Sequence, residues 1–205
     1  MQPLSQFTAV VFDLGGVITD LAPLKAFVAR HGIGLGQFFA AALDDGAHAR
    51  FERGDLDTDA YVDALFAEFA LDLDRDEFLA DFRTWPGQLY PGAAELVADV
   101  ADAGCVTAAL SNSNVEHWES DYLVTVVRPL FAHAFGSHAL RCAKPDPQIY
   151  LAVAAALGVE PAEIVFLDDN RINVEAAATV GFTARCVVGP HAASAALRAL
   201  GVLTS

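Results

Sequence analysis

The chain has 205 residues, of which 54% are hydrophobic and 19% charged, and its formal net charge is −15. This composition fits a globular protein with a substantial core and excludes dominant disorder, which goes with low hydrophobicity and few aromatic residues. The excess of 27 acidic over 12 basic residues argues against a nucleic-acid partner, because such binding needs clustered Lys and Arg.

No apolar run approaches the roughly 20 residues that cross a bilayer. No basic residue precedes Lys25, as a secretory signal would require, so we expect a cytoplasmic protein with no membrane partner.

The first predicted element is a strand near the N-terminus. Residues Thr8–Leu14 form an apolar run that carries Asp13 near its end and is followed by two glycines. Such a run is typical of a strand buried on both faces in a parallel sheet. The pattern from Asp20 to Pro86 then predicts helices throughout. Its apolar stripes comprise Leu21, Leu24, Phe27 and Val28, then Tyr61, Val62, Leu65, Phe66 and Phe69, then Phe78, Leu79 and Phe82.

Strands and helices alternate through the rest of the chain. Predicted helices span Pro91–Gly104, Pro147–Leu157 and Val174–Val180, and predicted strands span Val106–Ser111, Ile164–Asp168 and Thr183–Val188. This alternation predicts an α/β fold, with a doubly wound parallel (Rossmann-like) sheet and a helical cap subdomain inserted after the first strand. We assign residues 1–19 and 87–205 to the core domain and 20–86 to the cap.

Polar side chains cluster at the carboxyl ends of the predicted strands or near them. In chain order they are Asp13, Ser111, Asn112, Lys144, Asp168 and Asp169. In an open α/β sheet, ligands bind beyond these strand ends. Carboxylate oxygens suit Mg²⁺, a carboxylate can act as a nucleophile, and a lysine with a Ser/Asn pair can hold phosphate oxygens. Each residue also has an ordinary explanation as a turn, loop or helix-capping residue, but their joint placement favours a functional site. Lys144 is one of only two lysines in the chain.

Four segments, taken together, resemble the haloacid dehalogenase (HAD) superfamily. They are Phe12-Asp-Leu-Gly-Gly-Val17, Leu110-Ser-Asn-Ser-Asn114, Lys144-Pro-Asp-Pro147 and Phe166-Leu-Asp-Asp-Asn170, in the order of the family's motifs. The helical block matches the family's cap. Within it, Phe51-Glu-Arg-Gly-Asp55 falls where capped phosphatases of the family often carry an E-x-G-like turn, although this match is weak.

The resemblance implies a Mg²⁺-dependent phosphatase acting on a small phosphorylated substrate, as a monomer or homodimer. Asp13 would be the nucleophile that forms an aspartyl-phosphate, Ser111 and Asn112 would bind the transferring phosphoryl group, and Lys144 would neutralise its charge. The metal ligands would be the carboxylates of Asp13 and Asp169 and the backbone carbonyl of Gly15, with Asp168 in support. Phosphoryl transfer passes through a loose transition state, so positioning and charge neutralisation do most of the work.

Gly15 departs from the family pattern. Phosphatases of the family usually carry a second Asp two positions after the nucleophile, which protonates the leaving group and then activates water. Such catalysis contributes ~10²–10⁴-fold. Three explanations are open: the leaving group needs little protonation; another residue such as His48, Glu52 or Asp20 replaces the acid; or the protein binds phosphorylated ligands without turnover.

Other functions remain as alternatives. A 2-haloacid dehalogenase would share Asp13 as nucleophile, but that branch typically carries Tyr at the position of Gly15 and needs no metal. A phosphonate-cleaving relative would need a Schiff-base lysine in the cap, and Lys25 lies too near the start of the cap for that role. The glycines of Gly32–Gly36 lack the spacing of a dinucleotide-binding loop and follow a predicted helix rather than a strand.

Overall fold

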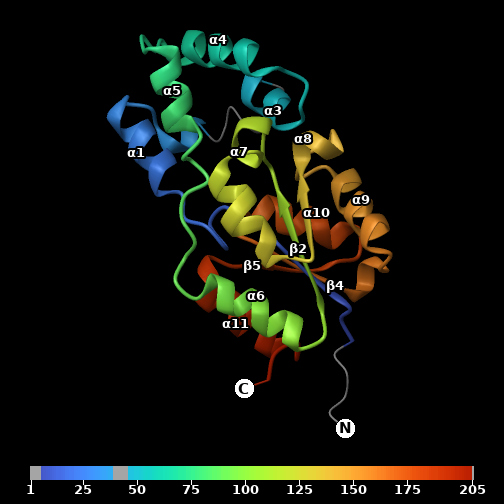
Figure 1. The fold of residues 1–205 in the computed structure, drawn as a ribbon. Coiled ribbons are helices and arrows are strands. Elements are labelled where there is room, and N and C mark those ends of the chain that lie inside the picture. The colour runs from blue at the N-terminus through green and yellow to red at the C-terminus, as the bar shows by residue number, and fades with distance from the viewer. Residues whose placement is uncertain (1–5, 39–45, 205) are drawn as a thin grey trace.

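The computed structural model describes residues 6–38 and 46–204, so residues 39–45 of the predicted cap lie outside the described residues. A five-stranded parallel sheet with the order β3-β2-β1-β4-β5 forms the centre of the molecule (Figure 1). Its strands are β1 (Ala9–Phe12), β2 (Val106–Ser111), β3 (His133–Gly136), β4 (Ile164–Asp168) and β5 (Thr183–Cys186). The predicted α/β class, with a helical insertion between the first two strands of the chain, is confirmed.

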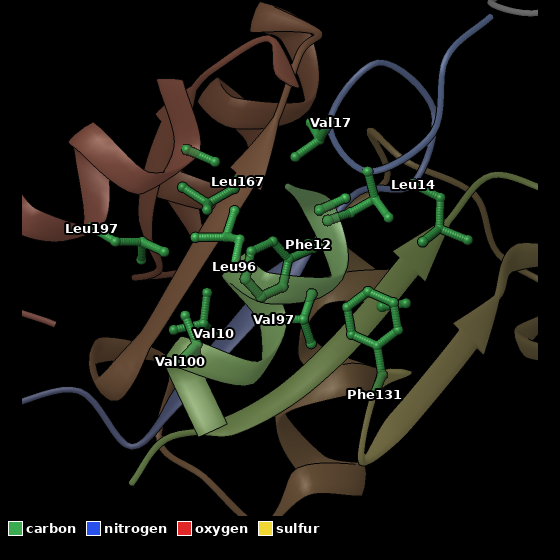
Figure 2. Close-up of a cluster of buried hydrophobic side chains, with 14 of the residues drawn as sticks. Val10, Phe12, Leu14, Val17, Leu96, Val97, Val100, Phe131, Leu167 and Leu197 are labelled. Carbon is green, nitrogen blue, oxygen red and sulfur yellow. The ribbon is translucent and has the colours of Figure 1, made fainter. Parts of the chain in front are cut away.

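Helices cover both faces of the sheet, and almost every residue of the central strands β1, β2 and β4 is buried. Val10 and Phe12 of β1 face a cluster with α6 (Ala93–Asp102) and α11 (Gly189–Ala199), as Figure 2 shows. The alternate residues of β1 face the opposite side, which is covered by α9 (Pro147–Leu157) and α10 (Arg171–Thr179). Each large apolar side chain buried in this way contributes about 1.5–3 kcal/mol. The central strands are therefore held rigidly, together with the residues at their carboxyl ends.

Local sequence sets the ends of the helices. Pro147 occupies the first turn of α9, Asp146 caps it by accepting a hydrogen bond from the backbone N–H of Gln148, and Gly158 ends it in the left-handed conformation. Helix α10 begins at Arg171, three residues before the predicted start, because the side chain of Asn170 caps it.

The insertion between β1 and β2 forms a second apolar core. Its described helices are α1 (Ala22–Arg30), α3 (Ala47–Glu52), α4 (Thr58–Phe69) and α5 (Arg75–Phe82). Aromatic rings dominate this core: the ring centroids of Phe27 and Trp85 lie 4.8 Å apart, and those of Phe51 and Tyr61 lie 4.2 Å apart. Such pairs contribute about 0.5–1.5 kcal/mol beyond the area they bury. The insertion thus has a core of its own. Figure 1 shows its helices at the end of the molecule opposite the two termini.

The two segments that connect the insertion to the sheet run side by side. The N–H of Asp20 donates to the carbonyl of Gln88 over 2.9 Å, and the N–H of Tyr90 donates to the carbonyl of Ile18 over 2.9 Å. These bonds join the two connecting segments near the predicted ends of the cap, whose bounds of 20 and 86 stay a prediction.

Strand β3 has no counterpart among the predicted strands. It has four residues, lies at the edge of the sheet, and is mostly partly exposed, so it lacks the apolar run that marks the central strands.

The remaining short elements are α7 (Val115–Trp118), the π-helix η1 (Leu123–Val127), the 3₁₀ helices η2 (Arg128–Leu130) and η3 (Pro161–Glu163), and α8 (Ser137–Leu140). None of the described helices is long and apolar enough to span a membrane.

Candidate active site

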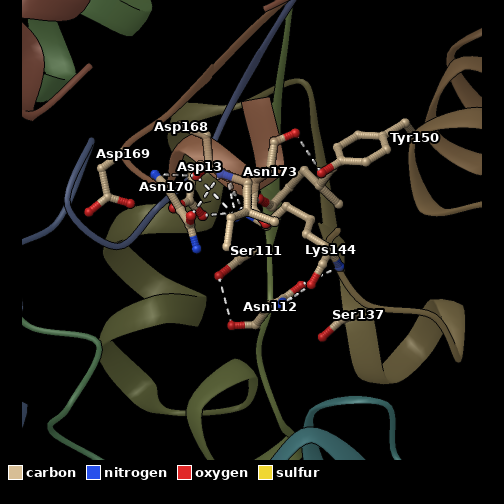
Figure 3. Close-up of polar contacts among 12 residues, drawn as sticks. Asp13, Ser111, Asn112, Ser137, Lys144, Tyr150, Asp168, Asp169, Asn170 and Asn173 are labelled. Atoms are coloured by element: carbon tan, nitrogen blue, oxygen red, sulfur yellow. Dashed lines mark hydrogen bonds and ion pairs between the residues drawn. The ribbon is translucent and has the colours of Figure 1, made fainter. Parts of the chain in front are cut away.

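An amine and two carboxylates meet at the carboxyl ends of β1 and β4. Lys144 Nζ lies 2.7 Å from Asp13 Oδ1 and 2.8 Å from Asp168 Oδ2, and all three residues are buried (Figure 3). The same amine donates to the carbonyl of Leu110 at the end of β2, over 3.1 Å. Lys144 therefore points into the site, as the sequence predicts, and its three N–H bonds have partners on three neighbouring strands.

Asn112 fixes the backbone of Lys144. Its side-chain oxygen accepts from the N–H of Lys144 over 2.8 Å, and its side-chain nitrogen donates to the carbonyl of Lys144 over 2.9 Å. The sequence predicts that the amide of Asn112 binds phosphate, but in this structure both of its polar atoms hold the lysine loop. Neighbouring Ser111 lines the same cavity, and its hydroxyl donates to the carbonyl of Asn112 over 3.3 Å.

Asp168 is engaged on both oxygens. Besides Lys144, it accepts from the side-chain amide of Asn173, over 3.1 Å to each oxygen, and from the N–H of Asn170 over 2.8 Å. The hydroxyl of Tyr150 donates to the carbonyl of Asn173 over 3.0 Å and so braces the same turn (Figure 3). Asp168 therefore orients Lys144, while Asp169 lines the cavity.

Asp169 lies against the backbone at Gly16. The φ of Gly16 is +79°, and a Cβ built there would overlap the Asp169 carboxylate, so only glycine fits beside that side chain. Ligand atoms of Asp13, Asp168 and Asp169 lie within 4.8 Å of one another. The three carboxylates predicted as metal ligands are thus close together at the carboxyl ends of β1 and β4.

The electrostatics of this cluster suit a cation. Burial, together with the charges of Asp168 and Asp169, raises the pKa of Asp13 to about 7 even though Lys144 opposes the rise. Burial and the charge of Asp168 also raise the pKa of Asp169. Burial lowers the pKa of Lys144, but the two carboxylates around it outweigh that effect and raise it overall. One ammonium for three carboxylates leaves excess negative charge, and hard carboxylate oxygens are the donor set that Mg²⁺ prefers.

A cavity of about 500 Å³ joins this cluster to the insertion. Its floor includes five residues predicted for the site, namely Asp13, Gly15, Ser111, Asn112 and Lys144. Its roof is largely apolar, and Leu24, Phe38 and Trp85 contribute to it. Glu52 and His48 also line the cavity from α3, whereas Asp20, the third residue considered as a replacement acid, is not part of the lining.

A buried polar chain supports Glu52 from within the insertion. Nε2 of His48 lies 3.5 Å from Glu52 Oε1, and Nδ1 of His48 lies 2.9 Å from the hydroxyl of Tyr61, which is fully buried. Ser137, at the start of α8, donates to the backbone carbonyl of Glu52 over 2.6 Å. The sequence does not predict the contacts of Ser137, Tyr61 and Asn173. For Asn173 a signal exists, because it lies in the first turn of α10, from which its side chain can face back toward Asp168.

Comparisons with known proteins identify the family. Residues 7–181 match the haloacid dehalogenase-like hydrolase family. The chain belongs to this family. Among curated HAD-like relatives, it is 26% identical over 196 residues to N-acetylmuramic acid 6-phosphate phosphatase of Pseudomonas aeruginosa, spanning 84% of this chain and 78% of the relative.

One further relative and one solved structure are also similar to this chain. A local match of 93 residues is 32% identical to (S)-2-haloacid dehalogenase 4A of Burkholderia cepacia and spans 45% of this chain and 40% of the relative. A HAD family enzyme of Bacteroides thetaiotaomicron, solved in complex with magnesium and inorganic phosphate, superposes with a TM-score of 0.69 at 22% identity. That superposition covers 87% of this chain and 93% of the other, and at this identity it concerns the fold.

Proposed function

We propose that this HAD-like hydrolase is a Mg²⁺-dependent phosphatase that acts on a small phosphorylated metabolite through an aspartyl-phosphate. The observation that supports this most is the placement of Asp13, which lies at the floor of the cavity, beside Lys144 and within a cluster of three carboxylates. A buried nucleophile paired with an ammonium suits attack on an anionic group, whose charge that ammonium offsets.

Each residue at the cavity floor has a role in this proposal. The Asp13 carboxylate attacks phosphorus, while Lys144 offsets the charge of the phosphoryl oxygens. Ser111 donates its hydroxyl to the phosphoryl group, and Asn112 contributes by holding the backbone of Lys144 in place. These roles fit phosphoryl transfer, in which positioning and charge neutralisation dominate catalysis.

Mg²⁺ would be held by the carboxylates of Asp13 and Asp169 and the backbone carbonyl of Gly15, with Asp168 behind them. When bound, it supplies positive charge that offsets the phosphoryl oxygens and the crowded carboxylates. The raised pKa values of Asp13 and Asp169 support this assignment, because both carboxylates gain from a nearby cation. The assignment of residues 20–86 as a cap that closes the site is part of the same proposal.

The experiment is a hydrolysis screen of wild type and Asp13→Asn over phosphate monoesters and 2-haloacids, with either Mg²⁺ or a chelator present. We expect phosphate release that requires Mg²⁺ and disappears in Asp13→Asn. Halide release in the presence of the chelator would instead assign the protein to the dehalogenases. Binding of Mg²⁺ and inorganic phosphate without turnover of any ester would indicate a non-catalytic binding protein.

A further inference from the structure

Gly15 leaves the nucleophile without the usual acid two residues away, and the local backbone does not demand glycine. The φ of Gly15 is not positive, whereas that of its neighbour Gly16 is +79°. A Cβ built at Gly15 would lie 3.2 Å from Leu21 Cδ2, the flexible end of an apolar side chain. A carboxylate could therefore be placed there by mutation, which gives a direct test of what replaces it. The following inference rests on the proposed phosphatase activity.

Few groups that line the cavity could move a proton. Apart from the Asp13, Lys144 and Asp169 cluster and Arg171, which stays charged, the titratable lining residues within 6–38 and 46–204 are His48, Glu52 and His117. The hydroxyl of Thr19 also lines the cavity, but it donates to the carbonyl of Leu14, and an alcohol is too weak an acid for the role. Asp20 lies outside the lining and accepts a hydrogen bond from the N–H of Ala22.

His117 is committed elsewhere. Its Nε2 lies 2.9 Å from the carbonyl of Phe82, to which it must donate, and its Nδ1 lies 3.2 Å from the side-chain nitrogen of Asn114, from which it must accept. Burial lowers the pKa of His117 to about 3, so the ring is neutral at pH 7. With both nitrogens engaged, it has no proton to give to a substrate.

His48 is hydrogen-bonded at Nδ1 and lies near Glu52 at Nε2, and this arrangement directs attention to Glu52. Burial raises the pKa of Tyr61 well above its usual value, so the phenol keeps its proton and donates it to Nδ1 of His48. The remaining ring proton lies on Nε2, which faces Glu52 Oε1. Because this contact uses Oε1, the second carboxylate oxygen of Glu52 is the one available to a ligand in the cavity.

The core holds this part of the insertion in place. The backbone carbonyl of Glu52 accepts from Ser137, and Arg141 of the core donates to the carbonyl of Gly54 and, over 2.8 Å, to Asp55. Gly54 has a φ of +71°, and a Cβ there would come within 2.9 Å of the carbonyl oxygen of His138. The turn after Glu52 therefore packs directly on the segment that follows β3, so the position of Glu52 is fixed relative to the strand ends that carry the nucleophile.

We infer that Glu52 is the catalytic acid and base that replaces the carboxylate absent at Gly15, and that His48 is its positioning residue. In the first step Asp13 forms a bond to phosphorus, the bond from phosphorus to the leaving oxygen breaks, and the Glu52 carboxyl gives its proton to that oxygen. In the second step water attacks the phosphorus of the aspartyl-phosphate, the bond to Asp13 breaks, and the proton of water passes to the Glu52 carboxylate.

The test compares pre-steady-state time courses, with substrate in excess over enzyme, on p-nitrophenyl phosphate, phenyl phosphate and glycerol 3-phosphate. In Glu52→Gln, cleavage of glycerol 3-phosphate should fall by about 10²–10⁴-fold, because its leaving alkoxide needs a proton. Release of p-nitrophenolate should fall by less than about tenfold and should show a burst, since hydrolysis of the aspartyl-phosphate then lacks its base. Glu77→Gln, an exposed change on α5, is the matched control and should leave all three rates as in wild type.

Two further variants distinguish catalysis from support. Gly15→Asp in the Glu52→Gln background should restore glycerol 3-phosphate cleavage and remove the burst. In His48→Gln, the cleavage rate should depend more steeply on the leaving-group pKa than in wild type, but less steeply than in Glu52→Gln. An active wild type whose leaving-group dependence is unchanged in Glu52→Gln would overturn this inference and leave the proposed function standing. Absence of hydrolysis of all three esters by wild type would overturn both.

Discussion

Lys144 Nζ lies 2.7 Å from Asp13 Oδ1, although 131 residues separate the two in sequence. The same ammonium reaches Asp168 at the end of a neighbouring strand, so one side chain connects the two acidic strand ends. Both carboxylates and the ammonium are buried, so the contact is screened little by solvent. This arrangement makes Lys144 responsible both for the charge balance of the site and for its geometry.

Lys144→Met should destabilise the protein and abolish turnover. It leaves two buried carboxylates without their counter-ion, and breaking a buried ion pair in this way costs about 3–5 kcal/mol. Urea unfolding in the presence of a chelator measures the loss of stability. Lys144→Arg should not restore activity, because a planar guanidinium does not replace a compact ammonium bonded to three acceptors. A Lys144→Met protein with wild-type stability and activity would refute this role.

Asp169→Asn should abolish the stabilisation that Mg²⁺ gives to the wild type. A ligand that binds only the folded state stabilises it by about 2.7 kcal/mol at a concentration 100 times its Kd. Wild-type Tm should therefore rise as Mg²⁺ is added, whereas the Tm of Asp169→Asn should stay constant. Asp99→Asn, an exposed change on α6, is the control and should respond as wild type does. An equal Mg²⁺ response in Asp169→Asn would place the metal elsewhere.

Gly16→Ala should impair Mg²⁺ binding through Asp169. The added methyl group would overlap the Asp169 carboxylate and would also require a side chain at a φ of +79°. Gly158→Ala provides the matched control, since Gly158 has a φ of +67° but no atom within 4 Å of its built Cβ. The control should lose only about 1–2 kcal/mol from backbone strain. We expect calorimetric Mg²⁺ titration to show weakened binding for Gly16→Ala alone.

His117 should make stability depend on pH. Its folded-state pKa is lowered to about 3 from 6.5, so the unfolded state binds the extra proton throughout this window. The stabilisation is therefore fully present above pH 6.5 and is lost as the pH falls toward 3. For a single group, the free energy of unfolding changes by at most about 1.4 kcal/mol per pH unit. We expect a smaller change here because the His117 ring is partly exposed. His117→Gln should flatten the difference between unfolding free energies at pH 7 and pH 5, and an unchanged pH dependence would contradict the assignment.

The sequence predicts strands β1, β2 and β4 well because they are buried on both faces. Runs such as Thr8–Leu14 and Ile164–Asp168 have few polar residues, and the site residues stand at their ends. Strand β3 is missed because a four-residue edge strand that is buried only at Gly136 needs no apolar run. Its position is set by pairing with β2, which is a tertiary effect.

The site is predicted less completely than the fold. The acidic strand ends and the scarce Lys144 are visible in the sequence, since each follows or precedes a recognisable element. The hydrogen bonds of Asn112 to the Lys144 backbone and of Ser137 to the Glu52 carbonyl join segments far apart in the chain. No local pattern encodes these contacts. The first forms only when β2 and the segment before α9 come together within the core, and the second only when the insertion packs on the core.

The central claim is that Asp13 becomes phosphorylated during turnover. The most direct measurement is rapid acid quenching of wild type with p-nitrophenyl phosphate, followed by peptide mass spectrometry of the segment that contains Asp13. The account predicts a phosphoryl group on Asp13 that forms with Mg²⁺ and is absent with a chelator. Phosphate release at full rate with no phosphoryl adduct on Asp13, or an Asp13 ester formed from 2-chloropropionate in the presence of the chelator, would contradict it.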